Sequence, residues 1–392
     1  MVESSSVLII AGEASADLHG ARVLHELRTR SPSTHVFGVG GEAMRAEGLE
    51  AVYRAEDISV AGLTEVLFAI PRILRILRDL ARIAAERRPK VAVLIDLPDF
   101  NLRLARRLKA LGIPVVYYIS PQVWAWRPKR VSQIRELVSR MLVILPFEED
   151  FYRVHGVAAE FVGHPLVEEL PAPSDRATAR LALGMAPGGG PVVALLPGSR
   201  KQEIQRHLHL MLAGLAQLRL RFPDIRALLP IASTVPRALI EAGVQRAGVE
   251  VTLLDGQASE ALAAADAAVV CSGTATLQTA LLLRPMVVVY RVSWLTYHIL
   301  KRLVRVAHIA LVNLIAGRTL VTELIQGGFT AATVAAELER LLTDDAARLS
   351  LEDDLAALRQ RLGERGAAER VAEVVAGYLP PSVVPAGDRA HG

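Results

Sequence analysis

The chain has 392 residues, which is long for one domain and indicates two. Hydrophobic residues make up 52% of it and charged residues 22%, which excludes a disordered or fibrous protein. The net charge of +4 is too small to argue for a nucleic-acid partner. The single cysteine, Cys271, excludes an internal disulfide and a cysteine-based metal site, so a reducing compartment is expected.

The N-terminal segment lacks the pattern of a signal peptide. Its first apolar run, Val7 to Ala11, has the length of a strand, and no basic region precedes it. No window approaches the roughly eighteen uninterrupted apolar residues of a membrane span. We therefore expect a cytoplasmic protein whose membrane contact is peripheral.

Short apolar runs alternate with helical patterns along the first half of the chain. They are SVLIIAG, HVFGVGG, VAVLIDLPDF, PVVYYIS, MLVILPF and AEFVGHP, and a helix is expected between the first two, from about Ala14 to Arg30. Strands that are apolar throughout are covered on both faces, which is typical of parallel sheets in α/β domains. After a Pro- and Gly-rich stretch from Glu169 to Pro191, a second series follows: VVALLPGSR, ALLPIAS, VEVTLLDG, AAVVCSGT and MVVVYRV. The sequence predicts two Rossmann-like α/β domains with parallel sheets.

The expected domains are residues 1–170 and 171–345, with terminal helices over 346–379 and a disordered tail over 380–392. An acidic run from Glu352 to Asp354 lies in the charged terminal pattern, where a solvated helix face explains it better than a metal site. Neither a G-x-G-x-x-G fingerprint nor a Walker A motif is present, which disfavours a dehydrogenase. No metal and no cofactor is expected.

Ligands of parallel α/β sheets bind beyond the carboxyl ends of the strands, so polar residues after each apolar run are candidate site residues. In the first half these are Glu13, Ser15, Asp17, Gly40, Gly41, Asp96, Asp99, Ser120, Gln122 and Trp124. In the second half they are Gly198, Ser199, Arg200, Asp255, Ser272, Gly273 and Thr274.

The PGSR turn is the strongest indication of an anion site. A buried strand ends there and a helix begins, so free backbone amides and the helix dipole favour a phosphate. Ser199 is the expected N-cap, with Gln202 at capping-box spacing. Arg200 is expected in the first helical turn, where a cation opposes the helix dipole, and a bound anion would explain its place there. An ordinary turn with an exposed arginine explains the stretch equally well. Ser272 to Thr274 repeat the pattern, and two such helix starts suit a diphosphate. The alternative is that the small residues there only let a helix and a strand pack closely.

Asp96 is the best candidate for a general base, because it ends an apolar run and its carboxylate should emerge at the sheet edge. Asp99 could share that work, and either Asp99 or Asp96 could instead cap the helix expected near Asn101. Which of the two takes a proton stays open.

Together the motifs resemble the lipid-A-disaccharide synthase family. They are AGEASADLHG, GVGG, IDLPDFN, YYISPQVWAWRPKR, LPFE with FVGHPL, LLPGSR, SGTATLQ, and LVNLIAGR with ELIQ, in this order from Ala11 to Gln326. The resemblance implies a GT-B fold, in which two Rossmann-like domains face a central cleft and the chain end packs back on the first domain. It also implies an inverting, metal-independent transfer from UDP-2,3-diacylglucosamine to 2,3-diacylglucosamine 1-phosphate, giving a β-1,6-linked disaccharide and UDP.

The resemblance assigns expected roles to particular residues. Asp96 becomes the base for the acceptor 6-hydroxyl, and Arg200 with Gly198 and Ser199 holds the diphosphate. Glu13 and Ser15 are expected near the sugars, with Asp99 also at the substrates. The residues expected near the nucleotide and the donor sugar are Ser272, Gly273, Thr274, Gln278, Asn313, Glu323 and Gln326.

Two positions depart from the family pattern. Ala16 stands where relatives usually have Gly, so the first turn must avoid a conformation that only Gly tolerates. Gln278 stands where they usually have Glu, a position that often binds the ribose. Glutamine accepts a hydrogen bond but carries no charge, which puts that role in doubt.

Acylated substrates imply peripheral contact with the cytoplasmic face of the inner membrane. Val60 to Leu80 and Ser293 to Val306 both place aliphatic and basic residues at helical spacing, although either can be the inward face of a surface helix. The sequence leaves open whether the protein forms a homodimer. The alternatives are another UDP-sugar GT-B enzyme, such as a muramyl-pathway transferase or an epimerase, and a periplasmic-type sugar-binding protein.

Overall fold

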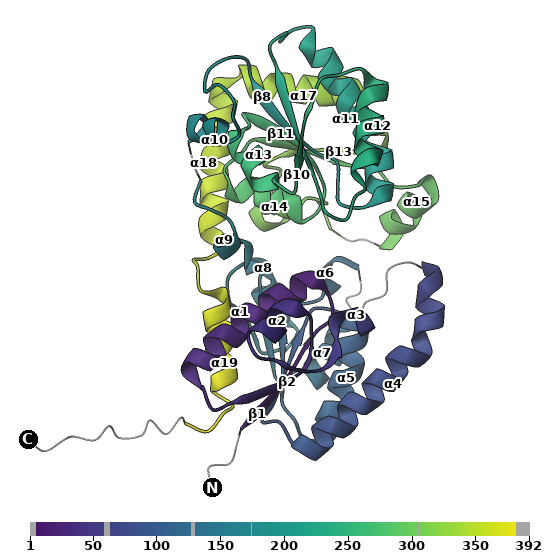
Figure 1. The fold of residues 1–392 in the computed structure, drawn as a ribbon, viewed down its shortest axis with the longest axis vertical. Helices are drawn as coiled ribbons and strands as arrows, with labels where there is room; N and C mark the ends of the chain where they lie inside the picture. The colour runs from purple at the N-terminus through teal and green to yellow at the C-terminus, as the bar shows by residue number, and fades with distance from the viewer. Residues whose placement is uncertain (1–4, 59–62, 127–129, 174, 304–305, 382–392) are drawn as a thin grey trace, which may run out of the picture. The chain divides into compact units, whose positions relative to one another are not determined.

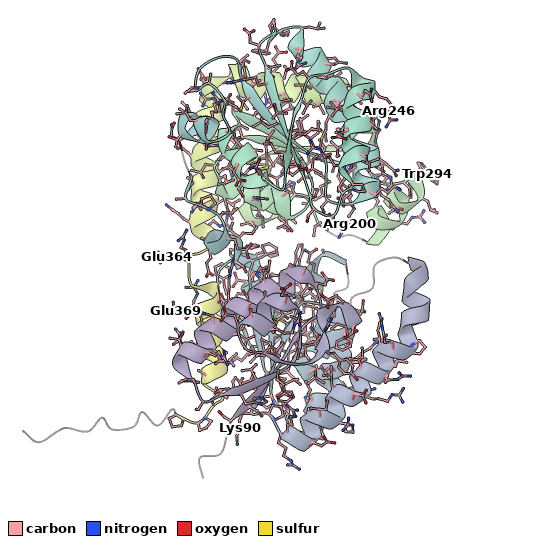
Figure 2. All side chains as sticks on the ribbon, in the orientation of Figure 1. Lys90, Arg200, Arg246, Trp294, Glu364 and Glu369 are labelled. Atoms are coloured by element: carbon pink, nitrogen blue, oxygen red, sulfur yellow. The ribbon has the colours of Figure 1, made fainter. Side chains whose placement is uncertain are left out.

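The computed structural model describes residues 5–58, 63–126, 130–173, 175–303 and 306–381, and its ribbon is drawn in Figure 1. The chain divides into two compact units, Met1–Pro165 with Glu364–Gly392, and Leu166–Gly363. It therefore passes from one unit to the other twice. Charged side chains such as Lys90, Arg246 and Glu369 are exposed on their own units (Figure 2), and the apolar strands are buried.

The first unit contains a 7-stranded parallel sheet of order β3-β2-β1-β4-β5-β6-β7. The strands are β1 (Ser6–Ala11), β2 (His35–Gly40), β3 (Glu50–Arg54), β4 (Val91–Ile95), β5 (Val115–Tyr118), β6 (Arg140–Val143) and β7 (Ala159–Phe161). The helices are α1 (Ala14–Arg30), α2 (Glu42–Ala46), α3 (Ala55–Ile58), α4 (Leu63–Arg87), α5 (Pro98–Ala110), α6 (Val123–Trp126), α7 (Arg130–Leu137), α8 (Pro146–Val154) and α19 (Ala367–Ala376).

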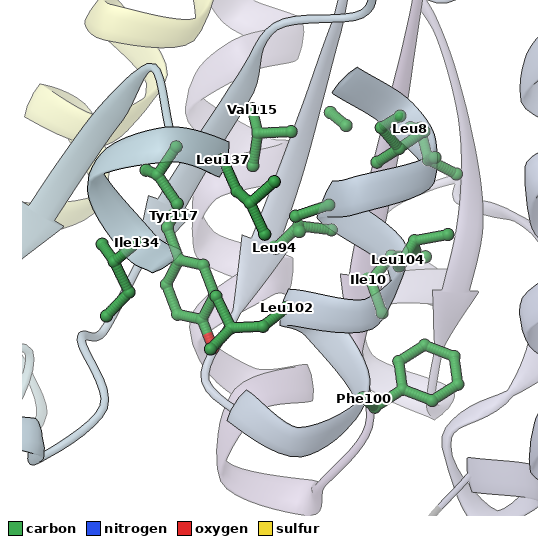
Figure 3. Packing of buried hydrophobic residues seen from close by; sticks show 14 of the residues in the cluster. Leu8, Ile10, Leu94, Phe100, Leu102, Leu104, Val115, Tyr117, Ile134 and Leu137 are labelled. Carbon is green, nitrogen blue, oxygen red and sulfur yellow. The ribbon is translucent and has the colours of Figure 1, made fainter. Parts of the chain in front are cut away.

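Alternate residues of the strands enter two separate core clusters, because successive side chains of a strand point to opposite faces. Leu8 and Ile10 of β1 belong to the cluster of Figure 3, together with Tyr117 of β5. Val7 and Ile9 belong to the other cluster, which also buries Val371 of α19. The last helix is thus part of the first unit because its apolar face completes that core.

The second unit contains a 6-stranded parallel sheet of order β10-β9-β8-β11-β12-β13. The strands are β8 (Val192–Leu196), β9 (Arg226–Ile231), β10 (Thr252–Asp255), β11 (Ala267–Cys271), β12 (Met286–Tyr290) and β13 (Thr322–Ile325). Its helical elements are α9 (Leu166–Glu169), α10 (Arg176–Ala182), α11 (Lys201–Arg219), α12 (Arg237–Ala247), α13 (Ala258–Ala264), α14 (Thr274–Leu281), α15 (Trp294–Leu303), α16 (Leu311–Ala316), the 3-10 turn η1 (Gln326–Gly328), α17 (Ala331–Thr343) and α18 (Asp345–Arg361).

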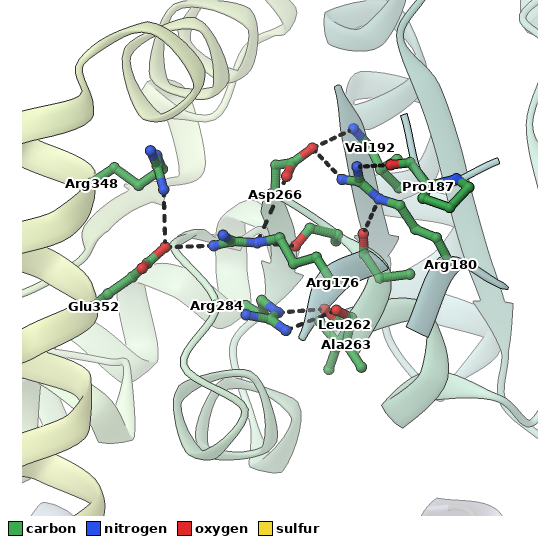
Figure 4. Close-up of polar contacts among 12 residues, drawn as sticks. Arg176, Arg180, Pro187, Val192, Leu262, Ala263, Asp266, Arg284, Arg348 and Glu352 are labelled. Carbon is green, nitrogen blue, oxygen red and sulfur yellow. Dashed lines mark hydrogen bonds and ion pairs between the residues drawn. The ribbon is translucent and has the colours of Figure 1, made fainter. Parts of the chain in front are cut away.

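The expected terminal segment 346–379 is divided between the two units. Its first helix, α18, belongs to the second unit, and only α19 belongs to the first. Helix α18 buries Leu351, Leu355 and Leu358, and an ion-pair network (Figure 4) adds to this, in which Glu352 of α18 accepts from Arg176 of α10 and from Arg348 of α18 itself. Asp354 pairs with Arg318 at 2.6 Å. The acidic run is therefore partly engaged in holding the helix, and is not only a solvated face.

Arginines of the same network cap the C-terminal end of α13, whose last carbonyls have no partner within the helix. Arg284 donates to Leu262 O at 3.1 Å and to Ala263 O at 2.8 Å, and Arg180 donates to Ala264 O at 3.0 Å (Figure 4). Burial lowers the pKa of Arg284 to about 10. Asp266 accepts from Arg180 at 2.6 Å and from the amide of Val192 at 2.8 Å, so it joins this cap to the first residue of β8.

A buried carboxyl group anchors the segment that follows β5. Glu148 of α8 is 1% exposed and accepts from Ser120 Oγ at 2.6 Å, Trp124 Nε1 at 3.0 Å and Leu145 N at 3.2 Å. Burial raises the pKa of Glu148 to about 7. The SPQVW segment at the carboxyl end of β5 is therefore held by Glu148, and Tyr152 of the same helix donates to Pro121 O at 3.4 Å.

Two short strands, β3 and β13, were not among the expected runs. Both lie at sheet edges and are only partly buried, with the sequences EAVYR and TELI. An edge strand keeps polar residues because one of its sides is open to water. A search for runs that are apolar throughout therefore passes over both.

We predict that Asp266→Ala lowers the free energy of unfolding by about 3 kcal/mol, because it leaves the mostly buried Arg180 guanidinium without its ion-pair partner. Urea unfolding followed by circular dichroism measures this. The control is Asp255→Ala, which breaks the exposed pair with Arg237 and should cost less than about 1 kcal/mol. If both variants lost the same free energy of unfolding, the pair of Asp266 with Arg180 would be no more important than an exposed ion pair.

The pH dependence of stability offers a test of Glu148. Its folded pKa of about 7 lies above the ordinary value of 4.5, so its stabilising contribution is complete below pH 4.5 and is lost as the pH rises through 7. The difference corresponds to about 3 kcal/mol. We expect the free energy of unfolding of the wild type to fall by that amount relative to Glu148→Gln between these pH values. Glu149→Gln, at the partly exposed neighbouring position, should show no such change relative to the wild type.

Candidate active site

In the first unit the sheet brings Glu13 and Asp96 to the same place. β1 and β4 are neighbours with Ala11 opposite Ile95, so the residues that follow these strands leave the sheet at adjacent positions. This is the switch point of the strand order, where ligands of such sheets bind. Glu13 and Ser15 are exposed at the start of α1, and Asp96 is partly buried.

Burial is the main cause that raises the pKa of Asp96, and the negative charge of Glu13 adds to it. A carboxylate with a raised pKa accepts a proton more readily than an ordinary one, as a general base must. The sequence indicated both acidic residues separately, and the fold makes them an interacting pair.

The neighbouring candidates have other tasks. Asp99 lies in the first turn of α5, is 71% exposed at its side chain and pairs with Arg130 at 2.5 Å. The helix begins at Pro98 and its N-cap is Leu97, so the expectation that Asp99 caps a helix near Asn101 was wrong. The proline at the first helical position sets the start three residues earlier than Asn101.

Asp17 was a strand-end candidate, but its carboxylate binds backbone amides at the start of α2. Its carboxylate is buried and accepts from the amides of Gly41, Ala43 and Met44 at 2.6, 3.0 and 3.2 Å, which caps α2. A Cβ atom at Gly41 would lie 2.5 Å from an Asp17 oxygen, so glycine is needed there. Ala16 lies buried in the helical first turn of α1, a conformation that alanine adopts freely.

In the second unit, one cavity of about 370 Å³ unites the predicted anion turns. β8 and β11 are neighbours, with Leu196 opposite Val270, so the turns that follow them meet. The lining includes both predicted turns and the position that departs from the family pattern: Gly198, Ser199, Arg200, Ser272, Gly273, Thr274 and Gln278, together with Glu203 and Cys271.

The PGSR turn differs from its expected capping. The N-cap of α11 is Arg200 and not Ser199, and the capping residue at the third helical position is Glu203 and not Gln202. Glu203 Oε2 accepts from Ser199 N at 2.9 Å and from Arg200 N at 3.1 Å. These amides therefore already hold an anion that belongs to the chain. Arg200 has an 82% exposed side chain, with one nitrogen 3.3 Å from Glu203 Oε1.

The start of α14 is built differently. Its N-cap is Gly273, with φ 153° and no side-chain hydrogen bond to the helix end. The hydroxyl of Ser272 donates to Ile309 O at 3.0 Å, and Gln278 Nε2 donates to Ser259 Oγ at 3.0 Å. Its N-cap residue thus provides no capping side chain, and among the described residues α14 is the helix start in this cavity that is left without the carboxylate that α11 has in Glu203.

The three remaining candidates hold loops together and are not among the residues lining the cavity. Asn313 is fully buried and donates to Val321 O at 2.9 Å and Glu323 Oε1 at 2.8 Å. Glu323 accepts in addition from the amides of Ile309 and Ala310. Gln326 exchanges hydrogen bonds with the backbone of Val292 at 3.0 and 3.3 Å.

Asp255 is likewise outside the cavity lining and pairs with Arg237. Sequence reasoning missed Glu148 and Glu203. Each lies three residues after its N-cap, Leu145 or Arg200, which is the capping-box spacing, but neither N-cap is a usual capping residue, so the pattern is hard to notice.

Across the described ranges, no group of three or more His, Cys, Asp or Glu side chains has the arrangement of a metal site. In the same part of the chain, no helix is long and apolar enough to cross a membrane.

Comparison with solved structures agrees with the fold. A putative UDP-N-acetylglucosamine 2-epimerase from Listeria monocytogenes superimposes with a TM-score of 0.64 at 11% identity, covering 95% of this chain and 96% of that one. The calicheamicin glycosyltransferase CalG4 has a TM-score of 0.59 at 17% identity, over 98% of this chain and 100% of that one. At such identities the likeness shows the fold alone, which is the GT-B arrangement of two α/β domains.

Sequence comparison identifies the family. The family model of lipid-A-disaccharide synthetase matches residues 7–375. The lipid-A-disaccharide synthase of Anaeromyxobacter dehalogenans is 54% identical over 380 residues, which is 96% of this chain and 98% of that protein. The one from Myxococcus xanthus is 49% identical over 98% of this chain and 100% of that protein. This chain belongs to the lipid-A-disaccharide synthase family, the glycosyltransferases that form the lipid A disaccharide.

Proposed function

We propose that this enzyme transfers the sugar of UDP-2,3-diacylglucosamine, with inversion, to the 6-hydroxyl of 2,3-diacylglucosamine 1-phosphate. Family membership supports lipid A disaccharide formation. The observation that carries the finer assignment is the cavity that unites the PGSR and SGT turns, since the start of α14 and the Arg200 guanidinium suit a nucleoside diphosphate.

The proposed reaction divides its chemistry between the two units. Asp96 removes the proton from the acceptor 6-hydroxyl as that oxygen bonds to C1 of the donor sugar. The bond from C1 to the β-phosphate oxygen breaks, and the electron pair leaves with UDP. Attack from the face opposite the leaving group inverts C1 and gives the β-1,6 linkage.

The leaving diphosphate gains negative charge, which a preorganised cation and helix amides stabilise. Because Glu203 occupies the amides of Ser199 and Arg200, we assign this task to the Arg200 guanidinium and to the start of α14. Glu203 then has the role of holding the turn that carries Arg200. Gln278 reaches the same cavity without a charge, so any contact with the ribose is a neutral hydrogen bond.

The test is UDP release by the purified protein in detergent, with and without acceptor and with EDTA. We expect release that depends on the acceptor and survives the chelator. Asp96→Asn should lower kcat about a thousandfold and leave UDP affinity unchanged, whereas Asp99→Asn should stay near wild type. Arg200→Ala should lower kcat about a hundredfold.

Turnover of the donor without an acceptor and without UDP release would instead indicate an epimerase. A defect in Asp99→Asn with normal turnover in Asp96→Asn would reverse the assignment of the base.

We also propose that the enzyme works at the cytoplasmic face of the inner membrane, where acylated substrates and nucleotide sugars meet. The support is α15, whose Trp294 (Figure 2) is 73% exposed and whose Leu295 is 64% exposed, and which carries Lys301 and Arg302 in its last turn. Such a helix suits an anionic lipid surface. The α4 candidate is less open in its described part, because Ile76, Leu77 and Leu80 are buried in the core.

Vesicle binding tests the α15 contact. The double variant Trp294→Ser, Leu295→Ser should bind vesicles of phosphatidylglycerol and phosphatidylethanolamine at least about tenfold more weakly, because it removes two large apolar side chains from the lipid contact. The control replaces Leu181 and Leu220, which are 60% and 84% exposed, by serine and should bind as the wild type does. Equal loss in both variants would contradict α15 as the contact.

A further inference from the structure

The turn that carries Asp96 is strained at two consecutive residues. Asp96 has φ 49° and Leu97 has φ 45° with ψ 60°, both in the left-handed region. Aspartate visits this region with a local cost, and leucine does so rarely, at a cost of about 1–2 kcal/mol. Pro98 follows at once and begins α5. Such a backbone persists only where its surroundings hold it.

Two buried side chains hold this turn through one atom, the carbonyl oxygen of Asp96. Tyr117 Oη donates to it at 2.5 Å from β5, and Asn101 Nδ2 donates to it at 2.7 Å from α5. Asn101 Nδ2 also donates to Ile95 O at 3.1 Å. Both residues are 0% exposed, so their hydrogen bonds are shielded from competing water.

The other half of the turn is held from the same helix. The amides of Asn101 and Phe100 donate to Leu97 O at 2.9 and 3.2 Å. The amide of Asp96 donates to Tyr118 O at 3.0 Å, the last link of the sheet. The peptide planes on both sides of Asp96 are therefore fixed by hydrogen bonds.

We propose that Tyr117 and Asn101 are positioning residues that aim the Asp96 carboxylate. A fixed carbonyl oxygen fixes the peptide plane, and the peptide plane fixes the direction of the Cα–Cβ bond of Asp96. Without the two donors, the turn can relax to an ordinary conformation that points the carboxylate elsewhere. A displacement of about 1 Å at a reacting group is enough to lower a rate a hundredfold.

This inference rests on the proposed role of Asp96 as the base. The alternative is that the two donors only stabilise the core of Figure 3, to which Tyr117 belongs. The two interpretations differ in what they predict for catalysis. A positioning role lowers kcat and leaves substrate affinity unchanged, while a structural role lowers stability alone.

The test is Tyr117→Phe, which removes one hydroxyl and preserves the packed ring. We expect kcat to fall about ten- to a hundredfold with the KM for the donor and the affinity for UDP unchanged. The matched control is Tyr53→Phe, which removes a hydroxyl that donates to Asp79 at 2.7 Å, on β3 at the sheet edge. The control should keep its kcat. Asn101→Asp, which replaces the donor by a charged acceptor, should have a larger effect than Tyr117→Phe.

A double variant separates the inference from the proposed function. If Tyr117 acts through Asp96, then Tyr117→Phe should add almost nothing in an Asp96→Asn background, because residues that act as a unit are not additive. A further full loss in that background, or a normal kcat in Tyr117→Phe while Asp96→Asn is inactive, would overturn the positioning role and leave the base in place. Normal turnover of Asp96→Asn would overturn the base and this inference with it.

Discussion

The register of parallel neighbouring strands is the constraint on which both candidate sites depend. In each sheet the first strand of the unit lies in the middle, with the second on one side and the fourth on the other. Ala11 faces Ile95 in one unit, and Leu196 faces Val270 in the other. Segments that are far apart in sequence thereby leave the sheet side by side. A shift of register between β1 and β4 would separate Glu13 from Asp96, whatever the conformations of their side chains.

The acidic side chains near these strand ends divide into two kinds. Asp17, Glu203 and Glu323 accept hydrogen bonds from backbone amides of their own unit, and so satisfy donors that helix starts and loops leave open. Asp96 also accepts from the backbone of Leu97, but burial together with the charge of Glu13 outweighs that hydrogen bond and raises its pKa. A carboxylate that stabilises the fold and one that can take a substrate proton are chemically the same group, and their surroundings distinguish them.

The contacts of the last two helices explain how the end of the chain is divided between the two units. Helices α18 and α19 have similar charged and Ala-rich sequences, and each is bound to its own unit by both apolar burial and polar contacts. Glu352 pairs with Arg176, and Val371 packs in the core cluster that contains Val7 and Ile9 of β1. Because the partners of each helix lie in a different unit, the chain must cross between the units a second time.

The two α/β domains, the family and the order of the motifs could be predicted from the sequence, because apolar strand runs and local turn signals each lie within a few consecutive residues. The sequence also indicated Asp96, Arg200 and the turns that line the cavity. The folded structure was needed to show that Glu203 accepts from the PGSR amides, that Asn313 donates to Glu323, and that Tyr117 and Asn101 donate to the carbonyl oxygen of Asp96. These are contacts between residues on different elements, and their partners are chosen by strand order, register and burial, none of which a local pattern contains.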